Sequence, residues 1–174
     1  MALYQEAPNP LANPGQAQAG GRRQLIVFKQ GEEEYGLTID QIKEVVITPH
    51  ITRMPQTPNY IRGVANVRGN IIAIVDLEEK FGLRPDPTTT GPTGNYTLVV
   101  ESDELKLGIL VREVPNTLAV LESEIEDAST LMYDGLAEGN YLKGVVKVKN
   151  RLIVLIDIFK VFKTGELGQM MKSA

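Results

Sequence analysis

Short apolar runs separated by turn-forming residues make up most of the chain. The run Leu-Ile-Val-Phe at residues 25–28 is followed by Gln-Gly-Glu at 30–32, and apolar character resumes at 34–37. The longest apolar runs, residues 71–75 and 152–156, hold five residues each. Runs this short, bounded by glycine and polar residues, predict β-strands. The opening segment is therefore predicted to be a β-hairpin, and no run approaches the roughly 20 residues of a membrane span.

An internal repeat is the most informative feature of the sequence. Residues 60–77 align without a gap to residues 141–158, at an offset of 81, and share Tyr, Gly, two Val, Ile and Asp. Phe81 and Phe162 extend the match. A weaker copy aligns residues 25–45 with 97–117 and sets Gly36 opposite Gly108. The repeat predicts two halves of the same architecture, roughly residues 22–92 and 93–164.

Each half has the same predicted order of elements. A hairpin opens it, a strand and a loop follow, and a second hairpin turns at Arg-Gly-Asn (68–70) or Lys-Asn-Arg (149–151), residues suited to tight turns. Asp76 and Asp157 then precede short segments that end in phenylalanine, and aspartate there is a good helix N-cap. Four or five short strands and a helical turn per half predict a mainly β protein built from two small barrels.

Proline-rich and glycine-rich segments mark the predicted boundaries. Residues 1–21 contain three prolines and one charged residue, without any hydrophobic period, and are predicted to be a flexible tail. The folded part is expected to span 22–164, and residues 165–174 are expected to be a C-terminal tail. Within residues 22–164, a loop with three prolines covers residues 48–59, and a linker of Pro, Thr and Gly covers 85–94.

Composition argues against enzyme chemistry. The chain has no cysteine, which excludes disulfides, thiolate zinc sites and cysteine catalysis. Its one histidine, His50, lies in a proline-flanked loop and is best explained as an exposed loop residue. Neither a Gly-x-Ser-x-Gly motif nor a phosphate-binding loop is present. We therefore expect a protein that is not an enzyme, with no catalytic residue, no cofactor and no metal site.

A basic stripe leaves one alternative function open. Lys143, Lys147, Lys149 and Arg151 occupy odd positions, which share a face on a continuous strand. Small barrels bind single-stranded nucleic acid through such a face with stacking aromatic residues. However, Tyr141 is the only aromatic residue between 134 and 158, and the net charge is −4. Nucleic-acid binding through residues 143–151 is therefore the alternative, and a solvated strand face is the expectation. A contact with an acidic protein partner or with the acidic hairpin of the second half is equally compatible with the stripe.

Arginine distinguishes the first half from the second. Arg62 and Arg68 stand where the repeat has Lys143 and Lys149. The guanidinium group is planar and binds bidentately, so arginine and lysine are not equivalent at interfaces. Arg68 can contact a partner or pair internally, for instance with Glu44, and these two interpretations are compatible.

Three segments carry a resemblance to a known family. They are residues 33–45 (Glu-Glu-Tyr-Gly-Leu to Ile-Lys-Glu-Val), 58–69 (Pro-Asn-Tyr-Ile-Arg-Gly-Val-Ala-Asn-Val-Arg-Gly) and 74–77 (Ile-Val-Asp-Leu). They closely resemble the CheW family of bacterial chemotaxis coupling proteins, and the likeness runs from about Gln24 to about Lys163. The resemblance implies a CheW-like domain over 22–164, made of two intertwined five-stranded SH3-like β-barrels with short helical segments.

The resemblance also implies a function. A member of this family is a non-enzymatic adaptor in the cytoplasm. It joins the cytoplasmic tip of methyl-accepting chemoreceptors to the regulatory domain of the histidine kinase CheA, in arrays at the inner face of the membrane but without insertion into it. The kinase-binding surface is expected on the second half. Carried over by position, the receptor-binding groove involves Ile42, Glu44, Val45, Gly63, Asn66 and Arg68. An apolar groove suits a helical tip, and Gly63 permits close approach.

Overall fold

The computed structural model describes residues 21–83, 94–103, 105–127 and 141–162. The predicted tails and the predicted linker at 85–94 fall almost wholly outside these residues. The strands are β1 (Arg22–Gln30), β2 (Glu33–Thr38), β3 (Ile42–Ile47), β4 (Ile51–Thr52), β5 (Ile61–Val67), β6 (Asn70–Val75), β7 (Tyr96–Glu101), β8 (Lys106–Val111), β9 (Asn116–Leu121), β10 (Ile125–Asp127), β11 (Leu142–Val148) and β12 (Arg151–Ile156). The short helices are η1 (Ile39–Gln41), α1 (Leu77–Phe81), η2 (Glu122–Glu124) and α3 (Ile158–Val161).

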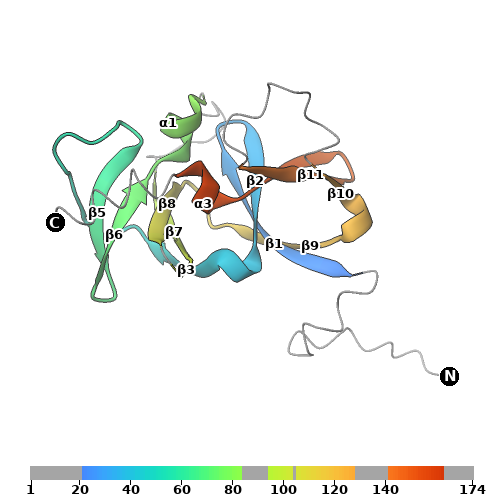
Figure 1. Ribbon diagram of the computed structural model, residues 1–174, viewed down its shortest axis with the longest axis horizontal. Coiled ribbons are helices and arrows are strands. Elements are labelled where there is room, and N and C mark those ends of the chain that lie inside the picture. Colours follow the sequence, from blue (N-terminus) through green and yellow to red (C-terminus); the bar gives the residue numbers. More distant parts are fainter. Residues whose placement is uncertain (1–20, 84–93, 104, 128–140, 163–174) are drawn as a thin grey trace.

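Two sheets exchange hairpins between the halves of the sequence (Figure 1). One sheet has the order β10-β11-β12-β2-β1-β9, and the other has the order β3-β7-β8-β6-β5-β4. Thus the β1–β2 hairpin of the first half joins strands of the second, where β2 runs parallel to β12. The β7–β8 hairpin of the second half joins strands of the first, where β8 runs parallel to β6. The expected mainly β, intertwined fold is confirmed, and the halves 22–92 and 93–164 repeat in sequence without each forming its own sheet.

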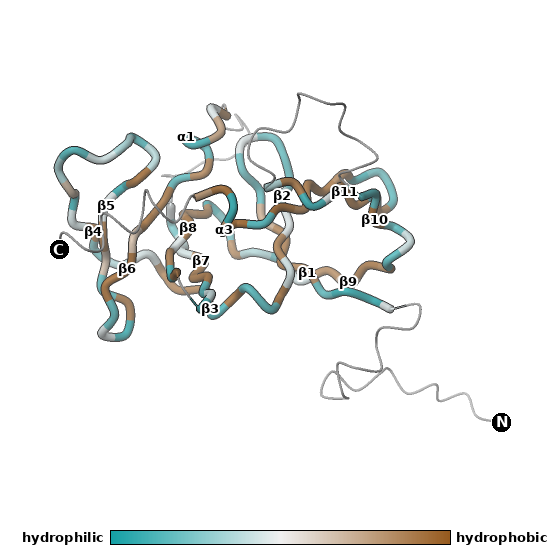
Figure 2. The backbone as a smooth tube through the Cα atoms, in the orientation of Figure 1, coloured by the Kyte–Doolittle hydropathy of each residue, from teal (hydrophilic) through white to brown (hydrophobic). Residues whose placement is uncertain are grey.

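Within the described residues each sheet contains six strands. Two of the edge strands are short, because β4 has two residues and β10 has three. In Figure 2 the hydrophobic stretches follow the strands and the hydrophilic stretches follow the connecting turns.

The largest hydrophobic core lies between the two sheets. It gathers buried residues from both, including Phe28 and Leu37 of one sheet and Leu98 and Ile109 of the other. Two smaller clusters fill the separate barrel interiors. Strand β6 contributes to two cores, because Ala73 faces the central cluster whereas its neighbours face a barrel interior. A strand buried on both faces must be apolar at consecutive positions, which explains the apolar residues at 72–75 but not Ile71, which is 60% exposed.

Aromatic pairs fasten the helical turns to the opposite half. Phe81 of α1 stacks on Tyr141, with ring centroids 5.5 Å apart, and Tyr60 packs on Phe162 at 5.7 Å. These pairs are related by the repeat, so each half provides a phenylalanine for the tyrosine of the other. Tyr35 also stacks on Phe81, with ring centroids 5.6 Å apart. Burial, reinforced by Glu33 and Tyr141, raises the pKa of Tyr35 to about 12.

Candidate partner-binding site

The β5–β6 hairpin presents Arg68 at its tip. Arg68 and Gly69 have φ of 52° and 86°, which is the backbone required by a two-residue turn between twisted strands. Asn66 stabilises this turn, because its Oδ1 accepts a hydrogen bond of 2.8 Å from the Gly69 amide. Arg68 is therefore held in a left-handed conformation at the tip of the hairpin.

Arg68 forms the internal pair that the sequence left open. Its Nε donates to Oε2 of Glu44 on β3 at 2.7 Å. The Arg68 side chain is 72% exposed and the Glu44 side chain is 20% exposed. The carboxylate therefore anchors one edge of the guanidinium, while most of the arginine surface stays accessible. This is compatible with a contact to a partner, which stays a prediction.

The apolar positions of β3 are separated from Glu44 by an irregularity in the strand. The register against β7 shifts between Ile42 and Glu44. As a result, Ile42 and Val45 pair with Val100 and Leu98, whose side chains join the central core. Glu44 instead lies on the opposite face of the β3-β7-β8-β6-β5-β4 sheet, since its partner Val99 belongs to the smaller cluster inside that barrel. Val45 is 38% exposed. The predicted groove residues on β3 thus lie on two faces of the strand.

Gly63 is required by the backbone around it. Its φ is +143°, and an added Cβ would lie 2.1 Å from the carbonyl oxygen of Thr52. The equivalent Gly144 of the second half lacks the positive φ but has the same close contact, with a Cβ 2.4 Å from the carbonyl oxygen of Glu126. Because both halves need the glycine, close packing of the neighbouring strand accounts for it. Its predicted contact with a receptor stays a prediction.

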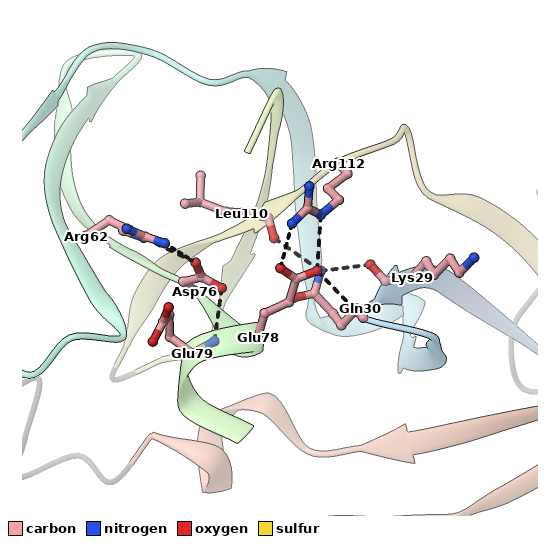
Figure 3. Close-up of polar contacts among 9 residues, drawn as sticks. Lys29, Gln30, Arg62, Asp76, Glu78, Glu79, Leu110 and Arg112 are labelled. Atoms are coloured by element: carbon pink, nitrogen blue, oxygen red, sulfur yellow. Dashed lines mark hydrogen bonds and ion pairs between the residues drawn. The ribbon is translucent and has the colours of Figure 1, made fainter. Parts of the chain in front are cut away.

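The two aspartates cap the helical turns. Asp76 is 2% exposed and accepts from the Glu79 amide at 3.3 Å. Its second oxygen accepts from Nε and Nη2 of Arg62, at 3.2 and 2.7 Å (Figure 3). Asp157 accepts from the Phe159 amide at 3.1 Å. Arg62, singled out only as a difference between the halves, thus completes the cap of α1.

Sequence reasoning missed a buried ion pair between α1 and the end of β8. Glu78 accepts from Nε and Nη2 of Arg112, at 3.2 and 3.0 Å, and from the Gly31 amide at 3.0 Å (Figure 3). The Glu78 side chain is 8% exposed. Burial alone would raise the pKa of Glu78, but the Arg112 and Gly31 hydrogen bonds and the charge of Arg112 together lower it. The pattern of α1 marks Glu78 only as a polar helix residue, so no sequence signal identified it.

The basic stripe at 143–151 is broken by the fold. Strand β11 ends at Val148, and Lys149 lies in the following turn with a φ of 55°. Arg151 belongs to β12 and binds Glu34 bidentately, at 3.0 and 2.7 Å. Only Lys143 and Lys147 remain as exposed cations along one strand. The extended basic face on which nucleic-acid binding depended is therefore absent from this part of the described chain.

The described ranges contain neither a candidate metal site nor a candidate membrane-spanning helix. No group of three His, Cys, Asp or Glu side chains there is placed to hold a metal ion. No helix within these ranges is long and apolar enough to cross a membrane. His50 is exposed in its loop.

Comparisons with known proteins agree on one family. The CheW-like domain family matches residues 24–166. A chemotaxis protein CheW of Treponema pallidum is 30% identical over 149 residues, which cover 84% of this chain and 86% of that protein. A chemotaxis protein CheW of Klebsiella aerogenes is also 30% identical over 149 residues, covering 84% and 85%.

A solved structure shares the architecture. The crystal structure of the scaffolding protein TtCheW from Thermoanaerobacter tengcongensis superposes with a TM-score of 0.68 at 28% identity. The match covers 83% of this chain and 96% of that one. The motif resemblance, the exchanged hairpins and these matches lead to the same conclusion: this chain belongs to the CheW family of chemotaxis proteins.

Proposed function

We propose that this protein is a cytoplasmic chemotaxis adaptor. It joins the cytoplasmic tip of methyl-accepting chemoreceptors to the regulatory domain of the histidine kinase CheA, and it acts in arrays at the inner face of the membrane. The proposal is supported by the chemotaxis proteins that it resembles and by the scaffolding protein that shares its fold. No step of bond chemistry is required, since an adaptor acts through binding free energy alone.

The pairing of Arg68 with Glu44 carries the receptor side of the proposal. A flexible arginine loses side-chain entropy when a partner immobilises it. Here Glu44 and the fixed turn orient the guanidinium beforehand, and the side chain is still 72% exposed. A planar, oriented donor of this kind suits a carboxylate or carbonyl group of a receptor helix. Ile42 and Val45, which lie on the other face of the same strand from Glu44, are the apolar part of the proposed receptor surface.

The fold supports binding of two partners at once. The central core joins both sheets, and each sheet contains strands from both halves of the sequence. A receptor bound near β3 and a kinase domain bound to the other barrel would therefore be held in a fixed relation. One partner can shift the equilibrium between two states of the other only if the assembly binds those two states with different affinities.

A titration with each partner tests the proposal. Isotope-labelled protein is titrated with a receptor-tip fragment and, separately, with the kinase regulatory domain, and amide signals are followed by NMR. We expect the receptor fragment to shift signals around Ile42 and Arg68, and the kinase domain to shift a different set on the second half.

Matched arginine variants sharpen the test. Arg68→Ala should weaken receptor binding by about tenfold or more, as expected for loss of a charge-assisted hydrogen bond, and should leave kinase-domain binding unchanged. Arg151→Ala is the control, because Arg151 also lies at a hairpin and also pairs with a glutamate. Equal effects of the two variants on receptor binding would exclude the assigned role of Arg68. Failure of both partners to bind would exclude the adaptor function.

A further inference from the structure

A polar cleft of about 330 Å³ lies beside helix α1, where the loop between β4 and β5 approaches it. Its lining comprises Arg53, Met54, Thr57, Pro58, Asn59, Ile61, Arg62 and Glu79. Strand β5 runs from this cleft to the hairpin tip that carries Arg68. Six steps along a strand, at about 3.3 Å each, separate its ends by about 20 Å. The cleft is therefore a site of its own, and it is independent of the proposed receptor contact.

The loop over the cleft is shaped in advance. Thr57 Oγ1 donates to the carbonyl oxygen of Met54 at 3.1 Å, and the Ile61 amide donates to that of Pro58 at 3.0 Å. Gln56 has a φ of 60°, a conformation that non-glycine residues adopt at an energetic cost and that recurs at binding sites. A ligand entering this cleft would not have to order the loop.

Two guanidinium groups line the cleft with different degrees of restraint. Arg62 is fixed by the buried carboxylate of Asp76 through Nε and Nη2. Its remaining nitrogen, Nη1, has no acceptor among the described residues, and its side chain is 40% exposed. Arg53 is exposed and forms no ion pair with any residue in the described ranges. The cleft thus offers one oriented donor and one guanidinium group without an ion-pair partner among the described residues.

Glu79 limits the charge of an acceptable ligand. Its carboxylate lines the same cleft, and Asp76 already neutralises Arg62. A dianionic phosphate would be repelled by Glu79 more strongly than a single carboxylate. Met54 and Pro58 supply apolar contacts for a short aliphatic chain. These features together fit a carboxylate carried on one or two methylene groups.

We propose that this cleft binds the side-chain carboxylate of a glutamate or aspartate on a protein partner. Arg53 and Nη1 of Arg62 donate to the carboxylate oxygens, and the methylene groups lie against Met54 and Pro58. The site is a second interaction surface on the first half of the chain.

The test uses the full chain and two short peptides. Acetyl-Ala-Leu-Glu-Leu-Ala-amide and its Gln analogue are titrated into labelled protein, and amide shifts are followed by NMR. The Glu peptide should move signals of residues 53–62 and of Glu79, and should bind about tenfold more tightly than the Gln peptide. Equal binding of the two peptides, shifts elsewhere only, or no shift at millimolar peptide would overturn the proposal.

Substitutions that remove one charge inside or outside the cleft separate a local charge effect on peptide affinity from an effect of the protein's net charge. Arg53→Gln should weaken the Glu peptide about tenfold, whereas Lys147→Gln, the same charge change outside the cleft, should alter it by less than about twofold. Glu79→Gln should tighten binding, and Glu126→Gln should not. Inorganic phosphate should compete more weakly than the Glu peptide. Matching effects within either pair of variants, or stronger competition by phosphate, would refute carboxylate recognition. Each substituted residue is exposed, so the variants should fold as the unaltered protein does, and an unchanged amide spectrum without peptide verifies this.

Discussion

Glu78→Gln tests the buried ion pair that joins α1 to the end of β8. The substitution keeps the shape of the side chain and an oxygen that can still accept from the Gly31 amide. It removes the negative charge that faces Arg112 at 3.0 Å. Arg112, whose side chain is only 13% exposed, then loses the Glu78 carboxylate as a counter-charge.

The expected loss of stability is large for a change of one functional group. Removing one partner of a buried pair costs about 3–5 kcal/mol. Since Arg112 retains some access to water, the lower end applies, and we expect about 3 kcal/mol. For a domain of this size each kcal/mol lowers the melting temperature by about 2–4 °C, so the shift should be about 6–12 °C.

Thermal and urea unfolding followed by far-ultraviolet circular dichroism measures this loss, since the chain has no tryptophan to report it by fluorescence. Glu34→Gln is the matched control. It makes the same chemical change in the pair with Arg151, in which the Glu34 side chain is 30% exposed and the Arg151 side chain is 43% exposed. This substitution should cost about 0–1 kcal/mol of folding stability. If Glu78→Gln loses no more stability than Glu34→Gln, the buried pair does not stabilise the junction and the reasoning is refuted.

The same pair should govern behaviour in acid. Because the folded-state pKa of Glu78 is lowered, its contribution is complete above the pKa of the unfolded chain, near 4.5. It should be lost as the pH falls through the lower folded-state value. Glu78→Gln removes the titrating group, so its stability should decline less steeply in this range than that of the unaltered protein.

Three further predictions follow from individual residues. Gly63→Ala should destabilise the fold by more than about 2 kcal/mol through collision with the backbone, whereas Gly69→Ala, at an open turn, should cost about 1 kcal/mol; equal melting temperatures would contradict this. Tyr35, with a pKa of about 12 against an ordinary value of 10.0, should stabilise the fold fully below pH 10.0 and progressively less toward pH 12; ultraviolet titration should show one late tyrosine that Tyr35→Phe removes. Arg68→Ala should change the unfolding free energy by less than about 1 kcal/mol, because its ion pair is exposed; a larger loss in urea unfolding would mean that Arg68 acts mainly in the fold.

Local sequence patterns predicted the strands, the hairpin turn and the helix caps, because each of these features is specified by neighbouring residues. Runs of four or five apolar residues bounded by turn residues are strands in the structure, and the turn at 68–69 forms where Arg-Gly was expected. Asp76 and Asp157 lie at the helix starts that their positions indicated. Each of these features depends on a few neighbouring residues, so a window of sequence contains the needed information.

Partnerships across the chain could not be predicted from such windows. Glu78 is buried by Arg112, 34 residues away, and by Gly31, 47 residues away. Arg151 belonged to an apparent basic stripe, but it pairs with Glu34, 117 residues away. An alternating or apolar pattern specifies that a segment is a strand, but not which strand lies beside it. The hairpin exchange came only from the family resemblance.

The exchange of hairpins restricts how this domain can respond to binding. Rotation of one sheet against the other would strain the connections that cross between them, at η1 between β2 and β3 and at the segment between β8 and β9. It would also separate Phe81 from Tyr141 and Phe162 from Tyr60, and expose part of the largest core. Burial of that apolar surface is worth about 25 cal/mol per Å² exposed. An adaptor of this kind therefore holds its partners in a fixed relative orientation and does not bend like a hinge. Any effect of one partner on the other then arises from equilibria between conformations of the partners themselves.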